Sequence, residues 1–432
     1  MSDDSNSGHP KSFQDTFTLF MGFDWAQKKD HEAVAVDAAG KIVLDRSVSQ
    51  TADGWSKLRD RLMARVGGDL AKVAVAVETS NGPAVEQLLA MGCQVYPMNP
   101  KAAQRYRDRK APSGPKSDRL DAWSFADALR TDGHGWRVLR PDDPLTQELR
   151  LLCHDEVRLI QQRTAMISQL REALYQYYPA VLDAFDDWTC PGAWAFVERF
   201  PTPAKLERAG KRRWQKFLHT HKLYRPQTYE RRMQIFSQAQ DFCGTAAVTN
   251  AKSRLAVTLA RQLRVLERQI QDYRKAIEEL FAQHPDHDIF DSLPGAGPKL
   301  APRLLTELGD DRERFEDAQA LQCYSGTAPV TRSSGMSRRV KCRVACNKSL
   351  RHAVHLWADL SRKSCVWAET YYQQKKAKGM SHACALRCLG QRWLKILWKM
   401  WQTRTCYDEA FHTRNQVRHG SWIVTLRQGD PC

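Results

Sequence analysis

The chain has 432 residues, of which 42% are hydrophobic and 27% are charged. This is globular composition, with room for two or three domains. The formal net charge of +17 indicates a polyanionic partner, for which nucleic acid is the first candidate. No apolar run reaches membrane-spanning length and the first residues are polar, so we expect a cytoplasmic protein without signal peptide or membrane contact.

The positive charge is concentrated in the last quarter of the chain. From Gln322 to Cys432 there are twenty Lys and Arg residues against five Asp and Glu residues, whereas the rest is close to balanced. We therefore expect the phosphate-binding surface to be mostly C-terminal. The alternative is a solvated basic surface that only aids solubility.

The twelve cysteines lie in apolar helical contexts and indicate a reducing compartment. Two pairs, Cys342 with Cys346 and Cys384 with Cys388, raise a zinc hypothesis. Their spacing is that of successive helical turns and not of a zinc knuckle, which makes zinc the less favoured interpretation.

The first elements alternate between strands and helices. Residues 1–16 are polar and are predicted to be a flexible tail. An apolar run then ends at Asp24, and two alternating segments on either side of Gly40 predict a β-hairpin. Further strands are predicted over 73–77, ending at Glu78, and over 93–97. Helices are predicted over 54–66 and 84–91, and from the capping residue Ser117 to about residue 130. This order predicts a ribonuclease-H-like α/β domain over residues 17–140.

The remainder reads as mainly helical. Residues 141–285 are predicted to form a helical domain whose two long helices make an antiparallel coiled-coil pair. A segment rich in tryptophan and proline, at about 185–244, is predicted to be a helical insertion without an assigned function. Residues 286–432 are predicted to form a C-terminal domain.

The C-terminal domain opens on a helix-hairpin-helix pattern. Gly295 and Gly297 permit a tight turn whose backbone N–H groups can approach a phosphate, with Lys299 in the helix that follows. An ordinary turn between two helices is the alternative.

Four carboxylates stand out by their placement. Asp24 and Glu78 end strands, whereas Asp118 and Asp121 share one face at the start of a helix. Four oxygen donors that converge on one point suit Mg²⁺, and two such ions about 3.5–4 Å apart can stabilise the attacking and leaving oxygens of phosphoryl transfer. Each acid alone could equally serve a cap, a turn or an ion pair.

Several blocks together resemble a known family. Gly22-Phe-Asp24-Trp-Ala-Gln-Lys-Lys-Asp, Val77-Glu78-Thr-Ser-Asn-Gly82 and Lys116-Ser-Asp118-Arg-Leu-Asp121-Ala resemble, in order, the N-terminal blocks of the DEDD-type insertion-sequence transposases. Leu293-Pro-Gly-Ala-Gly297 resembles the hairpin block of that family. The segment from Tyr324 to Gly335 resembles its serine-containing block. The resemblance covers both ends of the chain and most of the sequence between them.

The resemblance implies a fold and a chemistry. It implies a RuvC-like metal domain, a helical coiled-coil middle and a C-terminal transposase domain with a catalytic serine. Asp24, Glu78, Asp118 and Asp121 would hold Mg²⁺, and Ser334 would form a covalent phosphoserine link with DNA. Ser333 stands beside it, but alignment of the block on the glycine that follows, Gly335, favours Ser334.

The resemblance also implies partners. These are donor and target DNA, and an element-encoded, structured non-coding guide RNA, called a bridge RNA, that pairs with both. Family members act as homo-oligomers, here expected to be a dimer of dimers in which the serine of one subunit meets the metal site of another. The location would be cytoplasmic and nucleoid-associated. Basic residues around the serine are candidates for phosphate binding: Arg332, Arg338, Arg339, Lys341, Arg343, Lys348 and Arg351.

Three other interpretations compete. A hydrolytic nuclease, such as a junction resolvase, would use only the four acids and water. A protein with a decayed metal site would bind nucleic acid without cutting it. An RNA-binding scaffold could stack bases on aromatic residues such as Trp357 and Trp393, although core positions are the better explanation for these rings.

Overall fold

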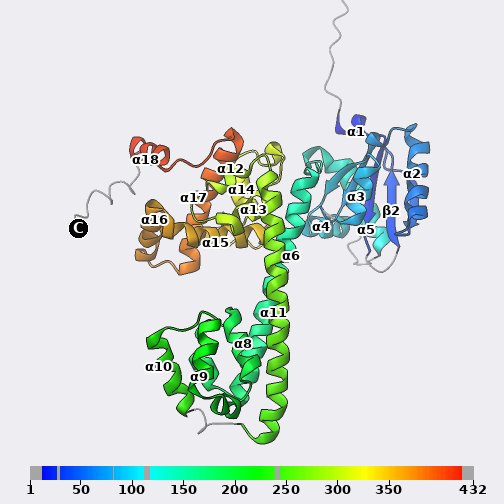
Figure 1. The fold of residues 1–432 in the computed structure, drawn as a ribbon. Coiled ribbons are helices and arrows are strands. Elements are labelled where there is room, and N and C mark those ends of the chain that lie inside the picture. Colours follow the sequence, from blue (N-terminus) through cyan, green and yellow to red (C-terminus); the bar gives the residue numbers. More distant parts are fainter. Residues whose placement is uncertain (1–11, 27–29, 81, 111–116, 239–243, 421–432) are drawn as a thin grey trace, which may run out of the picture. The chain divides into compact units, whose positions relative to one another are not determined.

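The computed structural model describes residues 12–26, 30–80, 82–110, 117–238 and 244–420. The chain divides into two compact units, Met1–Pro141 and Asp142–Cys432, which we describe separately (Figure 1). Within the described ranges, no helix is both long enough and apolar enough to cross a bilayer.

The first unit is built on a five-stranded mixed sheet. Its strands are β1 (Leu19–Asp24), β2 (His31–Val36), β3 (Ile42–Val48), β4 (Val73–Val77) and β5 (Gln94–Pro97). The spatial order is β3-β2-β1-β4-β5; β1 pairs antiparallel with β2 and parallel with β4. This mixed sheet is compatible with the ribonuclease-H-like domain expected from the sequence.

Helices cover both faces of this sheet. On one face α2 (Ala52–Val66) and α3 (Pro83–Ala90) pack on Leu19, Met21 and Phe23. On the other face α4 (Pro100–Lys110) and α5 (Asp118–Asp132) pack on Phe20. Successive strand residues point to opposite faces, so the odd-numbered residues of β1 face α2 and α3 and the even-numbered residues face α5.

The expected flexible tail differs from the structure at its end. Residues 1–11 of that tail lie outside the described part of the chain. Residues Phe13–Thr16 form a short helix, α1, which begins with a capping box between Ser12 and Asp15. The Phe13 ring contacts Phe17 and Tyr96 edge to face, with ring centroids 5.2 and 5.8 Å apart. This aromatic contact holds α1 on the sheet where a polar composition alone predicts a mobile segment.

Two long helices organise the second unit. They are α6 (Pro144–Tyr177) and α11 (Ala246–Gln283), and they lie side by side over most of their lengths (Figure 1). Ion pairs cross between them in the middle: Arg274 lies 2.7 Å from Glu156, and Arg163 lies 2.6 Å from Glu267. The two ends of the pair enter two separate hydrophobic cores.

One end carries a small helical lobe, which we call the arm lobe. It consists of α7 (Ala180–Ala184), α8 (Pro191–Arg199), α9 (Pro203–Thr220) and α10 (Pro226–Gln238). Trp188, Trp194 and Trp214 are buried in its core together with Phe196. The tryptophans of the predicted insertion therefore hold this lobe on the ends of α6 and α11.

The other end carries the C-terminal lobe, which packs on α6 and α11 through α13. Its elements are α12 (His287–Asp291), α13 (Gly297–Leu308), α14 (Ala318–Tyr324), β6 (Val330–Ser334), β7 (Ser337–Lys341), α15 (Lys348–Ser364), α16 (Val366–Ala377), α17 (His382–Thr403) and α18 (Glu409–Arg418). Trp357, Trp367 and Trp393 are buried in its core with their rings in contact. These rings are therefore not available to stack on bases.

A buried carboxylate joins three elements of the C-terminal part. Glu307 on α13 accepts a hydrogen bond from His154 of α6 at 2.7 Å and from the side chain of Asn347 at 2.6 Å. Burial raises the pKa of Glu307, but the hydrogen bonds from His154 and Asn347 outweigh burial and hold it below its ordinary value. The ionised carboxylate is thus the form that the fold stabilises.

The substitution Glu307→Gln is expected to lower the stability of this unit by about 2 kcal/mol at neutral pH, because charge-assisted hydrogen bonds are lost. A lowered folded-state pKa gives stability that is present above the unfolded pKa and is lost as the pH falls through the folded value. The gap in melting temperature between the two proteins should therefore be constant above about pH 5 and close below about pH 4. A gap that widens in acid would contradict this role.

Candidate active site

Two carboxylates lie side by side where β1 and β4 end. The parallel register pairs Gly22 with Ala76 and Phe23 with Val77, so it leads directly to Asp24 and Glu78. This is also where the order of the sheet changes direction, since β1 lies between β2 and β4. Ligands of open α/β sheets bind at the carboxyl ends of strands at such a point.

The sheet face to which these acids belong follows from strand alternation. On β1, Phe20 packs on the α5 side, and the alternate residues Gly22 and Asp24 face the same side. On β4, Ala74 and Ala76 belong to the same core, and Glu78, the next alternate residue, faces the same side. A Cβ atom on Gly22 would lie 1.8 Å from the carbonyl oxygen of Ala122. The part of α5 from Ala122 to Ala126 therefore crosses closely against β1, and a side chain at position 22 would prevent that approach.

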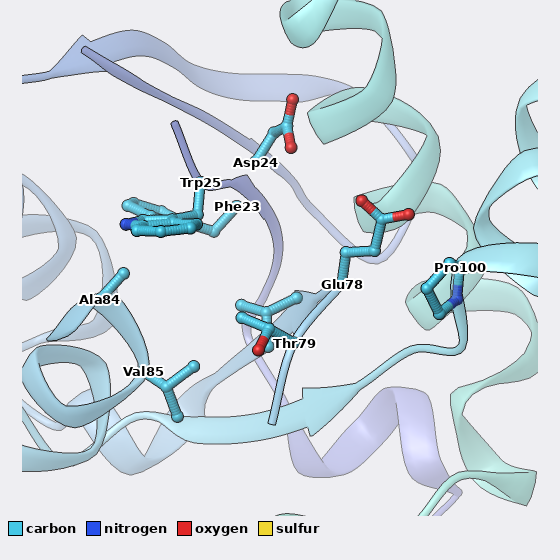
Figure 2. Close-up of a pocket in the computed structure, with 9 residues that line it drawn as sticks. Phe23, Asp24, Trp25, Glu78, Thr79, Ala84, Val85 and Pro100 are labelled. Atoms are coloured by element: carbon cyan, nitrogen blue, oxygen red, sulfur yellow. The ribbon is translucent and has the colours of Figure 1, made fainter. Parts of the chain in front are cut away.

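A cavity of about 290 Å³ opens at this edge of the sheet. Figure 2 shows Asp24 and Glu78 at this opening, each at the end of its strand, with the Trp25 ring and Thr79 nearby. Asp24 is partly buried and Glu78 is exposed. A solvent-borne ligand can thus reach both carboxylates.

The two acids of α5 differ from each other in their surroundings. Ser117 caps the helix, Asp118 is partly buried in the first turn, and Asp121 is only 6% exposed. Oδ1 of Asp121 lies 3.0 Å from Nε of Arg107 on α4, although the N–H is not aligned as in a hydrogen bond. The cation of Arg107 thus compensates the buried carboxylate of Asp121.

The four acids do not form a finished metal site in this conformation. Across the described ranges, no three His, Cys, Asp or Glu side chains are gathered closely enough to hold a metal ion. The same finding covers the two cysteine pairs considered for zinc. Strand register and the close approach of α5 bring the acids to one edge of the sheet. The guanidinium of Arg107 lies next to the carboxylate of Asp121. Lys116, part of the same sequence block, lies outside the described residues.

The serine block forms an exposed β-hairpin. β6 and β7 pair antiparallel, and every residue from Thr331 to Val340 is exposed. Gly335 begins the two-residue turn with a φ of 54°, a positive value that favours glycine at this position. The turn itself thus accounts for a glycine at position 335.

Cross-strand pairing separates the two candidate serines. Ser334 is opposite Ser337 and Arg332 is opposite Arg339, whereas Ser333 is opposite Arg338. Directly opposed residues share a face and neighbours in sequence do not. The Ser334 face of the hairpin therefore consists of Val330, Arg332, Ser334, Ser337, Arg339 and Lys341, and the Ser333 face of Thr331, Ser333, Arg338 and Val340.

Two of the residues expected to bind phosphate also hold the base of this hairpin. Arg343 donates from Nε to the carbonyl oxygen of Ala328 at 3.4 Å, and Arg351 donates to the carbonyl oxygen of Arg343. Asn347 caps α15 and donates its backbone N–H to the carbonyl oxygen of Tyr324 at 2.8 Å. Lys348 is exposed, as are the basic residues of the two strands.

The glycine turn before α13 also has a packing role. Both Gly295 and Gly297 have positive φ values, 75° and 54°. A Cβ on Gly295 would lie 2.6 Å from the backbone nitrogen of Ser361, so α15 covers that side of the turn. Gly297 has open space around it and Lys299 is exposed. Close packing against α15 accounts for the glycine at position 295. Gly297 and Lys299 lie on the open side of the turn, where a phosphate could approach.

Comparison with known proteins places both parts of the chain in one family. Residues 21–179 match a DEDD transposase domain, and residues 287–373 match the domain described as Transposase IS116/IS110/IS902 family. A protein of Streptomyces coelicolor, named as a mini-circle putative transposase for IS117, is 35% identical over 92% of this chain and 97% of its own length. The chain belongs to the IS110/IS116 family of transposases.

Other relatives of this transposase are more distant but also span most of the chain. An IS110 protein of Streptomyces coelicolor is 28% identical over 90% of the chain and 95% of its own length. An IS116 protein of Streptomyces clavuligerus is 28% identical over 91% of the chain and 96% of its own length. The chain is thus an enzyme that acts on DNA, and a DEDD domain suggests a divalent metal.

Sequence reasoning missed one residue beside the candidate site of this transposase. Arg107 lies in Arg105-Tyr-Arg107-Asp-Arg109, a basic run in the helix that precedes the acidic helix α5. The run was a usable signal, because a cationic helix beside buried carboxylates compensates their charge. Which of its arginines faces Asp121 depends on the packing of α4 against α5, which the sequence does not reveal.

Proposed function

We propose that this transposase is an RNA-guided DNA recombinase that exchanges strands through a phosphoserine link at Ser334. The position of Ser334 supports this most strongly. It lies at the tip of an exposed hairpin, beside a turn, on the face that carries Arg332, Arg339 and Lys341. A phosphate brought to this tip meets a hydroxyl and several cations together.

The covalent step is a phosphoryl transfer. Ser334 Oγ forms a bond to a DNA phosphorus while the bond from phosphorus to the leaving sugar oxygen breaks, and the serine proton passes to that oxygen through solvent. One phosphodiester replaces another, so the bond energy is retained and the second strand can displace the serine without ATP. Arg332 and Arg339 would hold the phosphate during both steps.

In the same proposal Asp24, Glu78, Asp118 and Asp121 hold Mg²⁺. Their carboxylate oxygens are the donors that this ion prefers. A bound divalent ion would neutralise charge that develops on the phosphate. The chain itself contributes the fixed pair Asp24 and Glu78, and the ion would replace the Arg107 cation at Asp121.

The exchange of cations at Asp121 gives a test that does not require activity. In Arg107→Gln the buried carboxylate loses its compensating charge, which should lower the stability of the metal-free protein by about 3 kcal/mol. Mg²⁺ should then raise the melting temperature of this variant more than that of the wild type. Arg109→Gln, an exposed arginine on the same helix, is the matched control. Equal responses to Mg²⁺ in all three proteins would rule out the exchange.

The proposed partners are donor DNA, target DNA and an element-encoded guide RNA, and the active form is a homo-oligomer, a dimer of dimers. The surplus of basic residues in the C-terminal part supports polyanionic partners. The exposed hairpin supports assembly, because an isolated two-stranded hairpin is marginally stable in water and gains order when a surface covers it.

A covalent-adduct assay tests the proposal. The protein is mixed with guide RNA, Mg²⁺ and labelled donor and target DNA, then denatured, separated on a gel and digested for mass spectrometry. We expect DNA linked to the peptide that contains Ser333 and Ser334, with fragmentation assigning the link to Ser334. Asp24→Asn is the negative control, since it should abolish both cleavage and adduct.

The second candidate is a hydrolytic nuclease that uses the four acids and water. The opening at Asp24 and Glu78 favours it to the extent that water can reach both carboxylates. It predicts that strands are cut without any protein–DNA adduct, and that the Ser334→Ala variant cuts DNA as the wild type does. Omitting the guide RNA tests the guidance itself, because RNA-guided recombination should stop without the RNA.

A further inference from the structure

The arm lobe has a basic surface of its own. From Arg199 to Arg232 there are eleven Lys and Arg residues against two Glu residues. Arg231 forms an ion pair with Asp186, and Arg232 is buried and donates to backbone oxygens. The other nine make no ion pair with any described residue. Averaging charge over long stretches of the sequence conceals this local surplus.

Helix α9 carries most of this charge. It is interrupted at Gly210, whose φ of 70° and ψ of 167° are not helical. In the segment that follows, Trp214, Phe217 and Leu218 are buried. We define the arm patch as the exposed basic residues of α9: Lys205, Arg208, Lys211, Arg212, Arg213 and Lys216.

Helical geometry places the patch away from the core. At 100° per residue, Arg212 and Lys216 lie opposite the buried face and Arg213 flanks it. Arg212 and Lys216 are also four residues apart, a like-charge spacing that destabilises a helix by a few tenths of a kcal/mol. Cations in the first turn, such as Arg212, further oppose the helix dipole. The patch therefore adds no stability to the lobe, which argues against a purely structural role.

We propose that the arm patch binds the phosphate backbone of duplex DNA outside the segment that undergoes strand exchange. Charge complementarity supports this, and DNA is the established substrate of the family. The large aromatic residues of α9, Trp214 and Phe217, are buried, so they offer no surface on which single-stranded bases could stack. Backbone contacts without base contacts give binding that is independent of sequence.

The length of α6 fixes where this contact can occur. Leu149 packs in the core of the C-terminal lobe and Leu174 in the core of the arm lobe. Twenty-five residues of helix separate them, which is about 37 Å. A duplex that reaches from one lobe to the other must extend about one helical turn beyond the hairpin-bearing lobe.

The test is equilibrium DNA binding by the full-length protein in EDTA, so that no strand is cut. Arg212→Gln, Arg213→Gln and Lys216→Gln are combined, since glutamine keeps the helix and removes the charge. On a duplex of about 40 base pairs, long enough to reach both lobes, fluorescence anisotropy should show at least about a tenfold weaker Kd. The slope of log Kd against log salt should fall by about 3, because each phosphate contributes about 0.9.

The control removes the same charge elsewhere. Arg59→Gln, Arg61→Gln and Arg65→Gln on α2 change exposed residues on the helix layer opposite α5. This variant should bind like wild type. If the triple variant loses helix content by circular dichroism, the double variant Arg212→Gln with Lys216→Gln is tested in its place. Unchanged DNA binding in the folded variants would overturn the proposal. Binding to a duplex RNA of equal length is measured in the same way, and a loss of affinity for this RNA alone would also overturn it. Neither outcome depends on Ser334, because no bond is made in the assay.

Discussion

Replacing Ser334 by alanine is expected to lower DNA strand exchange by about 10⁴-fold or more, because a nucleophile is removed and no neighbouring group has the same position. Ser334 lies on the hairpin face with Arg332 and Arg339, so those cations remain able to bind DNA. The affinity for DNA should therefore change less than about threefold. Single-turnover strand exchange and anisotropy on the same DNA measure the two quantities.

Ser333→Ala is the matched control for this loss. It removes the same atom from the adjacent residue, which lies on the opposite face of the hairpin. Strand exchange should stay within about a factor of ten of wild type, since surface substitutions of this kind rarely disturb a fold. If Ser333→Ala abolished exchange and Ser334→Ala did not, the two roles would have to be reversed.

Replacing Gly22 by valine is expected to disrupt the acid site without changing any acid. A Cβ atom at this position would lie 1.8 Å from the backbone oxygen of Ala122 and 2.7 Å from the backbone nitrogen of Ala126. These are main-chain atoms that cannot rotate away, so α5 must move outward from β1. Overpacking of this kind costs about 3 kcal/mol or more. The first unit should unfold at a clearly lower temperature, and cleavage should fall with it.

Gly135→Ala provides the comparison for this loss. A Cβ at Gly135 would meet nothing within 4 Å, and this glycine lies in the same unit. Thermal unfolding followed by circular dichroism should leave this variant near wild type. A Gly22→Val protein with an unchanged melting temperature would show that α5 does not depend on close contact with β1.

The sequence predicted the strand-end acids well because they follow from short-range rules. Alternating and buried strand patterns end at Asp24 and Glu78, and the cap Ser117 marks the start of α5. Strand register then brings the two acids together without further information. Arg107 was not predicted, since its contact with Asp121 depends on how two helices pack across fourteen residues of sequence.

The serine hairpin shows a different limit. Apart from one valine in each, its strands are polar or basic, so they lack the alternating apolar pattern by which strands are recognised. Without strands, the sequence could not assign Ser333 and Ser334 to different faces. The hydrogen bonds of Arg343 and Arg351 to backbone oxygens could likewise not be predicted, because a sequence reveals the charge of a residue but not its contacts.

The paired helices α6 and α11 also connect the motions of the two lobes. Both run continuously between the two lobes and are tied together by partly buried ion pairs, so we expect them to move as one stiff unit. Over about 37 Å, a tilt of about 5° at one end displaces the other by about 3 Å, close to the rise of one base pair. Under the proposed DNA contact, small changes in packing around Leu149 would therefore move the arm patch by about one base-pair rise relative to the C-terminal lobe.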